Sequence, residues 1–239
     1  MSELTKVAEW IRESSYTVIL TGAGMSTESG VPDFRSTGGW WRNINPQTVA
    51  NINAFHDNYE LFKDFYTMRL EKLRDCKPHE GHVVLAKWEE LGSLDFIATQ
   101  NVDGFHQQAG SQQVAELHGN IHKVRCQSCG QGYQESKFID GESCVCGGKL
   151  RPGVVLFGEF LPEEAWQRSL QAIERADLVI VIGTSLQVSP VNQLPSLTRG
   201  KKVYINFEVD RFTNDFDCIV QGSAKQTLQS LNEQLEGYK

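Results

Sequence analysis

Short apolar runs along the chain predict the strands of a buried sheet. The clearest run covers residues 177–182, and others cover residues 17–20, 95–99, 114–117 and 202–206. Runs that are almost continuously apolar and rich in β-branched residues are typical of parallel strands covered on both faces. We therefore expect the run at 177–182 to be central in the sheet and the run at 202–206 to be its last core strand.

Between these runs, apolar residues recur at helical spacing. Helices are predicted at residues 4–12, 58–74, 82–91, 162–176 and 225–235. Strands that alternate with helices favour an α/β fold with a Rossmann-like, doubly wound parallel sheet. Residues 37–77 lack clear strands, so this segment is predicted to be a helical insertion that leaves the sheet.

Composition narrows the class of protein further. The chain has 239 residues, of which 40% are apolar, so it can bury one large core with a small satellite and is not globally disordered. Its formal net charge of −7 disfavours direct binding to nucleic acid. No apolar run approaches the ~18 residues of a membrane span, and the N-terminus reads as an amphipathic helix rather than a signal peptide. We expect a cytoplasmic protein without a membrane partner.

A glycine turn follows the first predicted strand. Gly22, Ala23 and Gly24 come directly after the run at 17–20, and residues 26–29 (Ser-Thr-Glu-Ser) are typical of the capped first turn of a helix. We expect Gly22 to turn the chain through a conformation closed to other residues, and Gly24 to let a ligand approach the main chain. A strand, a glycine turn and a helix N-terminus together suit a pyrophosphate.

This signal is weak by itself, because the third glycine of the dinucleotide fingerprint is missing. The following run, Pro32, Asp33, Phe34 and Arg35, has two interpretations. It is either a surface loop with a local ion pair, or a loop that covers a cofactor and holds two charges over a ribose or a pyridinium ring.

Four of the six cysteines form a metal-binding pattern. Cys126 and Cys129 are separated from Cys144 and Cys146 by 14 residues, and glycines follow each pair at Gly130, Gly147 and Gly148. Four thiolates on two tight turns suit tetrahedral zinc. Because four sulfur ligands leave no open position, we expect this zinc to be structural.

Several motifs together resemble one family. The run GAGMSTESGVPDFRS, the run TQNVDGFHQQAG, the phrase ELHG and the segment VVLFGE resemble motifs of the sirtuins, which are NAD-dependent protein deacylases. The resemblance implies a Rossmann-like NAD-binding domain formed by residues 1–36, 78–121 and 153–239. It also implies a small domain made of the helical insertion at 37–77 and a zinc-binding module at 122–152. The close spacing of Cys144 and Cys146 departs from the usual pattern of the family.

The resemblance also implies a role for individual residues. His118 matches the catalytic base, and Asn101 and Asp103 match residues suited to stabilising a cationic sugar. Residues 154–159 match the segment with which an acylated peptide pairs as an extra strand, and the substrate residues assigned there are Val154, Leu156, Phe157 and Gly158. The positions assigned to NAD are Gly22, Ala23, Gly24, Thr27, Asp33, Phe34, Arg35, Gln100, Asn101, Asp103, His118, Gly183, Thr184, Ser185, Asn206, Glu208 and Ala224.

In the reaction that the resemblance implies, the acyl oxygen of an acyl-lysine attacks the nicotinamide ribose and nicotinamide leaves. His118 then takes a proton from a ribose hydroxyl, which moves the acyl group onto the sugar. Water is consumed in the final step, which releases O-acyl-ADP-ribose and the free lysine. The substrate partner is an acylated lysine in a protein, and we expect the enzyme to be a monomer.

Three other functions stay open. A protein ADP-ribosyltransferase would use the same NAD site but would add mass to its target. A conventional dehydrogenase is disfavoured by the missing glycine and the cysteine cluster. A non-catalytic binding module leaves Asn101, Asp103 and His118 without a role.

The acyl group is suggested by a pair of residues on the predicted helix at 58–74. Tyr66 and Arg69 lie one turn apart, and sirtuins that prefer succinyl-lysine and malonyl-lysine resemble this chain in that pair. One helix turn lets a hydroxyl and a guanidinium meet the same carboxylate. The alternative is that Tyr66 packs in the core and Arg69 is solvated, and Asp33 departs from the subgroup, which often has Thr there.

Overall fold

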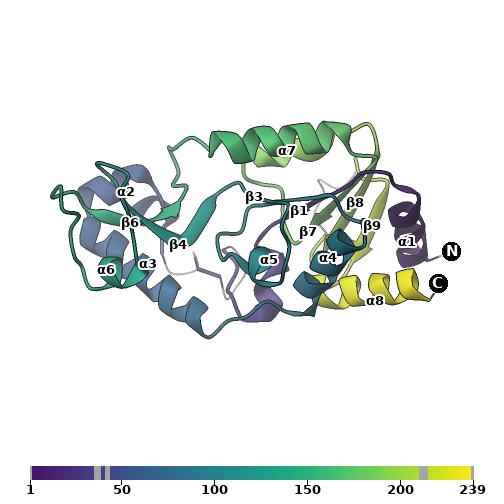
Figure 1. Cartoon of the computed structure of the whole chain (residues 1–239), viewed down its shortest axis with the longest axis horizontal. Helices are drawn as coiled ribbons and strands as arrows, with labels where there is room; N and C mark the ends of the chain where they lie inside the picture. Colours follow the sequence, from purple (N-terminus) through teal and green to yellow (C-terminus); the bar gives the residue numbers. More distant parts are fainter. Residues whose placement is uncertain (1, 35–38, 41–43, 210–214, 238–239) are drawn as a thin grey trace.

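The main sheet consists of strands that all run in the same direction. The structure is a computed structural model, and it describes residues 2–34, 39–40, 44–209 and 215–237 (Figure 1). Within these ranges the sheet has six strands in the order β3-β2-β1-β7-β8-β9. Their bounds are β1 (Thr17–Thr21), β2 (Phe96–Thr99), β3 (Val114–Glu116), β7 (Leu178–Ile182), β8 (Lys201–Asn206) and β9 (Cys218–Gln221).

The strand order fixes where a ligand can bind. The chain proceeds outward from β1 to β3 on one side and from β7 to β9 on the other, so its direction of travel reverses between β1 and β7. The register sets Thr21 beside both Thr99 and Ile182, which aligns the carboxyl ends of β1, β2 and β7. In open parallel sheets, the crevice at such a reversal is the usual ligand site.

Helices cover both faces of this sheet. One face is covered by α1 (Glu3–Glu13), α4 (Glu80–Glu90) and α8 (Ala224–Glu236), and the other by α7 (Glu163–Arg175) and the 3-10 helix η4 (Val191–Ser196). Figure 1 shows α7 on the opposite side of the strands from α4 and α8. Side chains of β7 alternate between the two layers, with Ile180 in the first core and Val181 in the second. The strand at 177–182 is therefore central, as its composition predicts.

A smaller part of the molecule lies at the far end from both termini (Figure 1). It contains a three-stranded antiparallel sheet in the order β5-β4-β6. Its elements are α2 (Ile52–Asp57), α3 (Tyr59–Arg74), β4 (Gly119–Cys126), β5 (Gly132–Tyr133), α6 (Glu135–Ile139) and β6 (Leu150–Val154). Phe62 of α3 packs in one apolar cluster with Phe138 and Leu150, so the helical insertion and the cysteine region share a core.

Two expectations from the sequence are wrong. Residues 26–29 do not begin an α-helix: Ser26 lies between two three-residue 3-10 turns, η1 (Ala23–Met25) and η2 (Thr27–Ser29), and residues 27–29 form the second of them. The strand at 201–206 is not the last one, because β9 pairs with it at the sheet edge. The remaining short elements are η3 (Pro46–Thr48) and α5 (Phe105–Gln108). Within the described residues, no helix combines the length and apolarity of a membrane span.

The central strand offers a test of the core. Ile180 is completely buried between sheet and helices, and Ile180→Ala should lower the free energy of unfolding by about 2–5 kcal/mol because it leaves a cavity. Chemical denaturation measures this loss. Val145→Ala is the control, since Val145 is 93% exposed; an equal effect of both substitutions would contradict the assignment of Ile180 to the core.

Candidate functional site

One large cavity runs along the carboxyl ends of the parallel strands and continues toward the smaller part of the molecule. Its volume is about 1510 Å³. Of the residues that the sequence assigns to NAD or to the substrate, those that line the cavity are Ala23, Gly24, Thr27, Asp33, Phe34, Tyr66, Arg69, Gln100, Asn101, His118, Val154, Leu156, Phe157, Gly158, Gly183, Thr184, Ser185, Asn206, Glu208 and Ala224. Gly22 and Asp103 lie outside this lining, and Arg35 lies outside the described residues.

Two glycine turns pack against each other in the crevice between β1 and β7. The Gly24 amide donates to the Gly183 carbonyl over 2.7 Å, and a Cβ on Gly24 would lie 2.8 Å from the Gly183 Cα. Gly183 has φ +64°, and a Cβ there would overlap the Met25 amide nitrogen. Only glycine fits both positions, because the left-handed conformation and the close approach exclude a side chain.

The role expected of Gly22 needs correction. Its φ of −133° and ψ of −168° are extended values that any residue adopts. Glycine is needed there for space, since a Cβ would lie 2.5 Å from the Thr184 Cβ. The expected stabilisation of a pyrophosphate by a helix dipole is also wrong, because η1 and η2 are single three-residue turns and have no substantial dipole.

The cavity has two arms: a first arm along the carboxyl ends of the strands and a second arm along residues 154–158. His118 lies between the residues of the two arms. It follows β3, and its Nδ1 is 3.1 Å from the Gln100 carbonyl oxygen, which can only accept a hydrogen bond. Nδ1 therefore carries the proton and Nε2 is the basic nitrogen. Burial lowers the pKa of His118, and the bond to Gln100 offsets this only in part. The ring is consequently neutral at pH 7 and able to take a proton.

A buried polar group supports the floor of the cavity near His118. The Ser26 hydroxyl donates to Asp103 Oδ2 over 2.8 Å and accepts from Asn101 Nδ2 over 3.0 Å. Asp103 also accepts from the Phe105 amide. Burial raises the pKa of Asp103, although the bonds from Phe105 and Ser26 oppose this rise. Asp103 is thus linked to Asn101 through the Ser26 hydroxyl, and the sequence analysis did not assign Ser26 to the site.

Hydrogen bonds connect the far end of the strand edge to His118. Asn206 Nδ2 donates to the Tyr204 hydroxyl over 2.9 Å, and that hydroxyl donates to the Thr184 carbonyl over 2.8 Å. The Thr184 hydroxyl in turn accepts from Gln100 Nε2 over 3.0 Å. Tyr204 was also missed by the sequence reading, because its β-branched and apolar neighbours mark it only as a strand residue.

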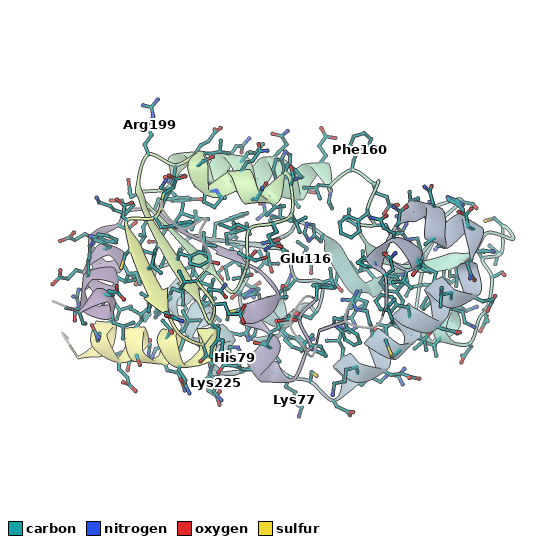
Figure 2. The ribbon with its side chains drawn as sticks, turned by 180° about the vertical axis from the view of Figure 1, so that it is seen from behind. Lys77, His79, Glu116, Phe160, Arg199 and Lys225 are labelled. Atoms are coloured by element: carbon teal, nitrogen blue, oxygen red, sulfur yellow. The ribbon has the colours of Figure 1, made fainter. Side chains whose placement is uncertain are left out.

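The wall at the start of α8 is tied to the first glycine turn. Glu28 of η2 accepts from the Lys225 amide over 2.7 Å, next to Ala224. His79 supports the same turn from below, where its Nε2 donates to the Met25 carbonyl over 2.7 Å. Figure 2 shows His79 and Lys225 close together near the start of α8.

The second arm of the cavity follows residues 154–158. The Val155 amide donates to the His118 carbonyl over 2.8 Å, so this segment starts directly beside the histidine. The Phe157 amide and carbonyl bond to Ala50 and Ile52 of the smaller part. Phe160, which is 98% exposed, projects into solvent from the loop before α7 (Figure 2).

Tyr66 and Arg69 line the inner end of this second arm. The Arg69 guanidinium lies 5.5 Å from the centroid of the Tyr66 ring, and the two residues are only 7% and 2% exposed. The aromatic rings of Phe34, Trp40 and Phe65 surround the guanidinium. The alternative of a solvated Arg69 is therefore wrong. Arg69 Nε has no hydrogen-bond partner within the part of the chain that the structure describes.

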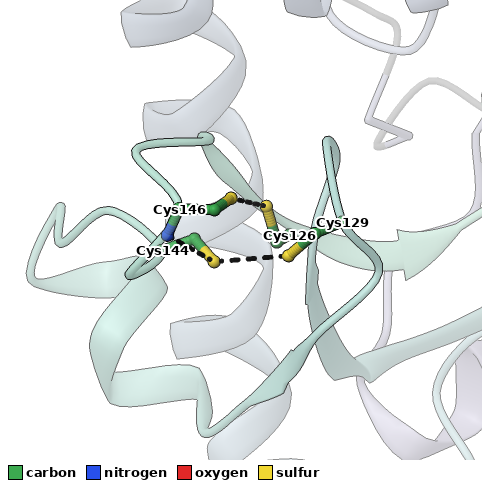
Figure 3. A group of neighbouring side chains, drawn as sticks. All are labelled: Cys126, Cys129, Cys144 and Cys146. Atoms are coloured by element: carbon green, nitrogen blue, oxygen red, sulfur yellow. Dashed lines mark hydrogen bonds between the residues drawn. The ribbon is translucent and has the colours of Figure 1, made fainter.

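The four cysteines come together within the smaller part of the molecule, from the turn after β4 and the loop between α6 and β6 (Figure 3). Their sulfur atoms all lie within 4.8 Å of one another. Cys126 and Cys146 are 3.6 Å apart at sulfur, and Cys129 and Cys144 are 3.5 Å apart. A tetrahedron with Zn–S bonds of about 2.3 Å separates its sulfurs by roughly 3.8 Å. The cluster thus fits a structural zinc, and the short Cys144–Cys146 spacing does not prevent the ligands from converging.

Comparison with known proteins identifies the family. Residues 22–190 match the model described as the Sir2 family. The chain is 48% identical over 235 residues to an NAD-dependent protein deacetylase 1 of Geobacillus kaustophilus, covering 96% of this chain and 97% of the relative. It is 39% identical over 236 residues to an NAD-dependent protein deacylase of Thermococcus sibiricus, covering 92% of both. The chain belongs to the Sir2 family, the sirtuins.

Solved structures agree with this membership. A Sir2 homologue in complex with NAD superposes with a TM-score of 0.92 at 38% identity, covering 100% of this chain and 95% of that one. A Sir2 variant bound to a deacetylated p53 peptide and 3'-O-acetyl ADP-ribose has a TM-score of 0.92 at 33% identity, covering 98% of both chains.

The cysteine cluster predicts a metal content. Purified protein should hold about one zinc per chain, and Cys129→Ser should reduce this content and lower the melting temperature, because a ligand is lost. Elemental analysis and thermal unfolding measure both effects. Cys218→Ser, at a buried cysteine away from the cluster, should keep the zinc. A metal-free protein with the melting temperature of the zinc-loaded form would contradict the site.

The hydrogen bonds of Tyr204 predict that loss of its hydroxyl weakens nucleotide binding in the arm of the cavity along the strand ends, called the NAD arm below. Tyr204→Phe removes a hydroxyl that orients Thr184 and Asn206. A loss of about 1 kcal/mol should weaken ADP-ribose binding roughly fivefold. Calorimetric titration measures the affinity, with Tyr16→Phe before β1 as the control. Parent-like affinity in the Tyr204 variant would show that the hydroxyl does not orient the site.

Proposed function

We propose that this chain is an NAD-dependent protein-lysine deacylase that forms nicotinamide and an O-acyl-ADP-ribose. The observation that carries the proposal is the meeting of the cavity's two arms at His118. One arm runs along the strand ends and the glycine turns, where a dinucleotide is bound in doubly wound folds. The other follows residues 154–158, which line the cavity and of which residues 157 and 158 are exposed; a peptide could pair along this segment as an extra strand.

Each group at the junction has a task in this reaction. NAD supplies a ribose whose bond to nicotinamide can break. Nε2 of His118 accepts the proton of a ribose hydroxyl, since its ring is neutral and oriented by Gln100. Asn101, held by Ser26, presents a polar side chain toward developing positive charge on the sugar. Asp103 adds its charge from behind Ser26.

The chain around this centre is proposed to form the two domains that the sequence predicts. Residues 1–36, 78–121 and 153–239 hold NAD, and residues 37–77 and 122–152 form the small domain that bears zinc. Zinc serves only to hold that domain together, because all four ligands are sulfur. The substrate is acylated lysine within proteins, and we propose that the enzyme acts as a monomer in the cytoplasm.

The reaction is tested by incubating the protein with NAD and acylated peptides. Mass spectrometry should find peptides lighter by their acyl group, together with nicotinamide and O-acyl-ADP-ribose in equal amounts. A peptide that gains ADP-ribose would identify a transferase instead, and intact peptides with consumed NAD would identify neither activity.

The acyl group is proposed to include acidic chains. A succinyl or malonyl group ends in a carboxylate, which must be paired once it leaves water. Arg69 and Tyr66 offer a guanidinium and a hydroxyl at the buried end of the peptide arm. Burial raises the pKa of Tyr66, so the hydroxyl keeps its proton and can donate it. We therefore expect desuccinylation or demalonylation at least comparable to deacetylation.

His118→Ala should abolish catalysis while the fold and NAD binding persist. Loss of a general base reduces kcat on the order of 10²-fold or more. In the parent, kcat should fall as pH drops through a pKa below 6.5, because protonation removes the base. His56→Ala, an exposed residue of α2, is the control. Near-parental turnover by the His118 variant would exclude this residue as the base.

Arg69→Met should separate the two acyl classes. Succinyl-peptide turnover should fall on the order of tenfold or more, since the partner of the carboxylate is lost, while acetyl-peptide turnover stays largely intact. Arg74→Met is a matched control, because Arg74 is exposed on the same helix. Equal losses on both substrates, or a parent without desuccinylation, would refute the acyl preference and leave the deacylase proposal standing.

A further inference from the structure

Arg151 is a fully buried charge that neither the NAD site nor the zinc site uses. Its side chain is 0% exposed, and a buried guanidinium is costly unless it is paired and fully hydrogen-bonded. Its Nη1 lies 2.7 Å from Glu159 Oε1 and its Nη2 lies 2.9 Å from Glu159 Oε2, in a forked pair. Such bidentate geometry fixes the orientation of both partners.

The other N–H groups of Arg151 bond to residues of β6 and of the turn after β4. Nη2 donates to the Val154 carbonyl over 2.5 Å, and Nε donates to the Pro152 carbonyl over 3.3 Å. Nη1 also contacts Gln127 Oε1 over 3.3 Å. One side chain thus joins β6, the loop after it, and the turn between Cys126 and Cys129.

Glu159 fixes the loop from its other end. Its Oε2 accepts from the Leu156 amide over 2.8 Å, while its own amide donates to the Leu156 carbonyl over 3.0 Å. Burial raises the pKa of Glu159, but the bonds from Arg151 and the Leu156 amide together hold it below its ordinary value. Between Leu156 and Glu159, Gly158 turns the chain with φ +92°.

The loop that this pair holds is the wall of the peptide arm. Leu156, Phe157, Gly158 and Glu159 all line the cavity. We propose that Arg151 and Glu159 are positioning residues for the acylated peptide, whose ion pair holds residues 154–159 in the conformation with which the peptide pairs. This inference rests on the proposed function. It assigns peptide binding, and not NAD binding, to the ion pair.

Two conservative substitutions separate this role from a general effect on folding. Glu159→Gln keeps an oxygen for the Leu156 amide but removes the charge that Arg151 faces. Arg151→Lys keeps the positive charge but removes the fork. Glu142→Gln is the matched control, because it breaks a 2.9 Å ion pair with Lys137 that is exposed in the same part of the molecule.

The readouts are the KM for acyl-peptide, the KM for NAD, the affinity for ADP-ribose, and hydrogen exchange of residues 152–159. Both test variants should raise the KM for peptide on the order of tenfold and speed exchange of this segment, since a charged hydrogen-bond network is broken. Both should bind ADP-ribose as the parent does. The control should match the parent in every measurement, and if Arg151→Lys fails to fold, Glu159→Gln alone decides.

Two results overturn the inference. The first is unchanged exchange and unchanged KM for peptide in a folded Glu159→Gln variant. The second is a loss of ADP-ribose affinity as large as the loss for peptide, which would mean that the pair only stabilises the fold. If the parent removes no acyl group, the proposed function fails, and hydrogen exchange still decides whether the pair orders the segment.

Discussion

The contact between two glycine turns is the constraint on which the site depends. Gly24 and Gly183 approach so closely that neither tolerates a side chain, and the amide of one bonds to the carbonyl of the other. This contact can form only where β1 and β7 are neighbours with aligned carboxyl ends, which is the reversal point of the sheet. Sheet order, register and the two turns therefore specify one another, and the cavity opens above them.

The two arms of the cavity are stabilised by different interactions. The NAD arm is continuous with the sheet, and hydrogen bonds of Tyr204 and Thr184 extend its order to Gln100 and His118. The peptide arm is a loop that a few backbone hydrogen bonds hold, from Val155 to His118 and from Phe157 to Ala50 and Ile52. A forked ion pair between Arg151 and Glu159 adds to these bonds. His118 belongs to both arms, because its ring bonds to the Gln100 carbonyl and its own carbonyl accepts from the Val155 amide.

The fold was largely predictable, because buried parallel strands leave continuous apolar runs in the sequence. The edge strand β9 was missed because it has only four residues, Cys218–Gln221, too few for a clear apolar run. The helix expected after Gly24 was wrong because capping residues also favour isolated turns. Site residues with a sequence motif could be assigned by resemblance. Ser26, Tyr204 and the Arg151–Glu159 pair could not, because their importance lies in partners brought together by the fold.

The central claim is that NAD and an acylated peptide meet at His118, and a structure of the ternary complex tests it most directly. Crystals of His118→Ala with NAD and a succinylated peptide should trap both substrates. We expect the acyl-lysine and the nicotinamide ribose to adjoin at residue 118, with the peptide paired along residues 154–158. A peptide bound elsewhere, or NAD whose nicotinamide end points away from residue 118, would contradict the account.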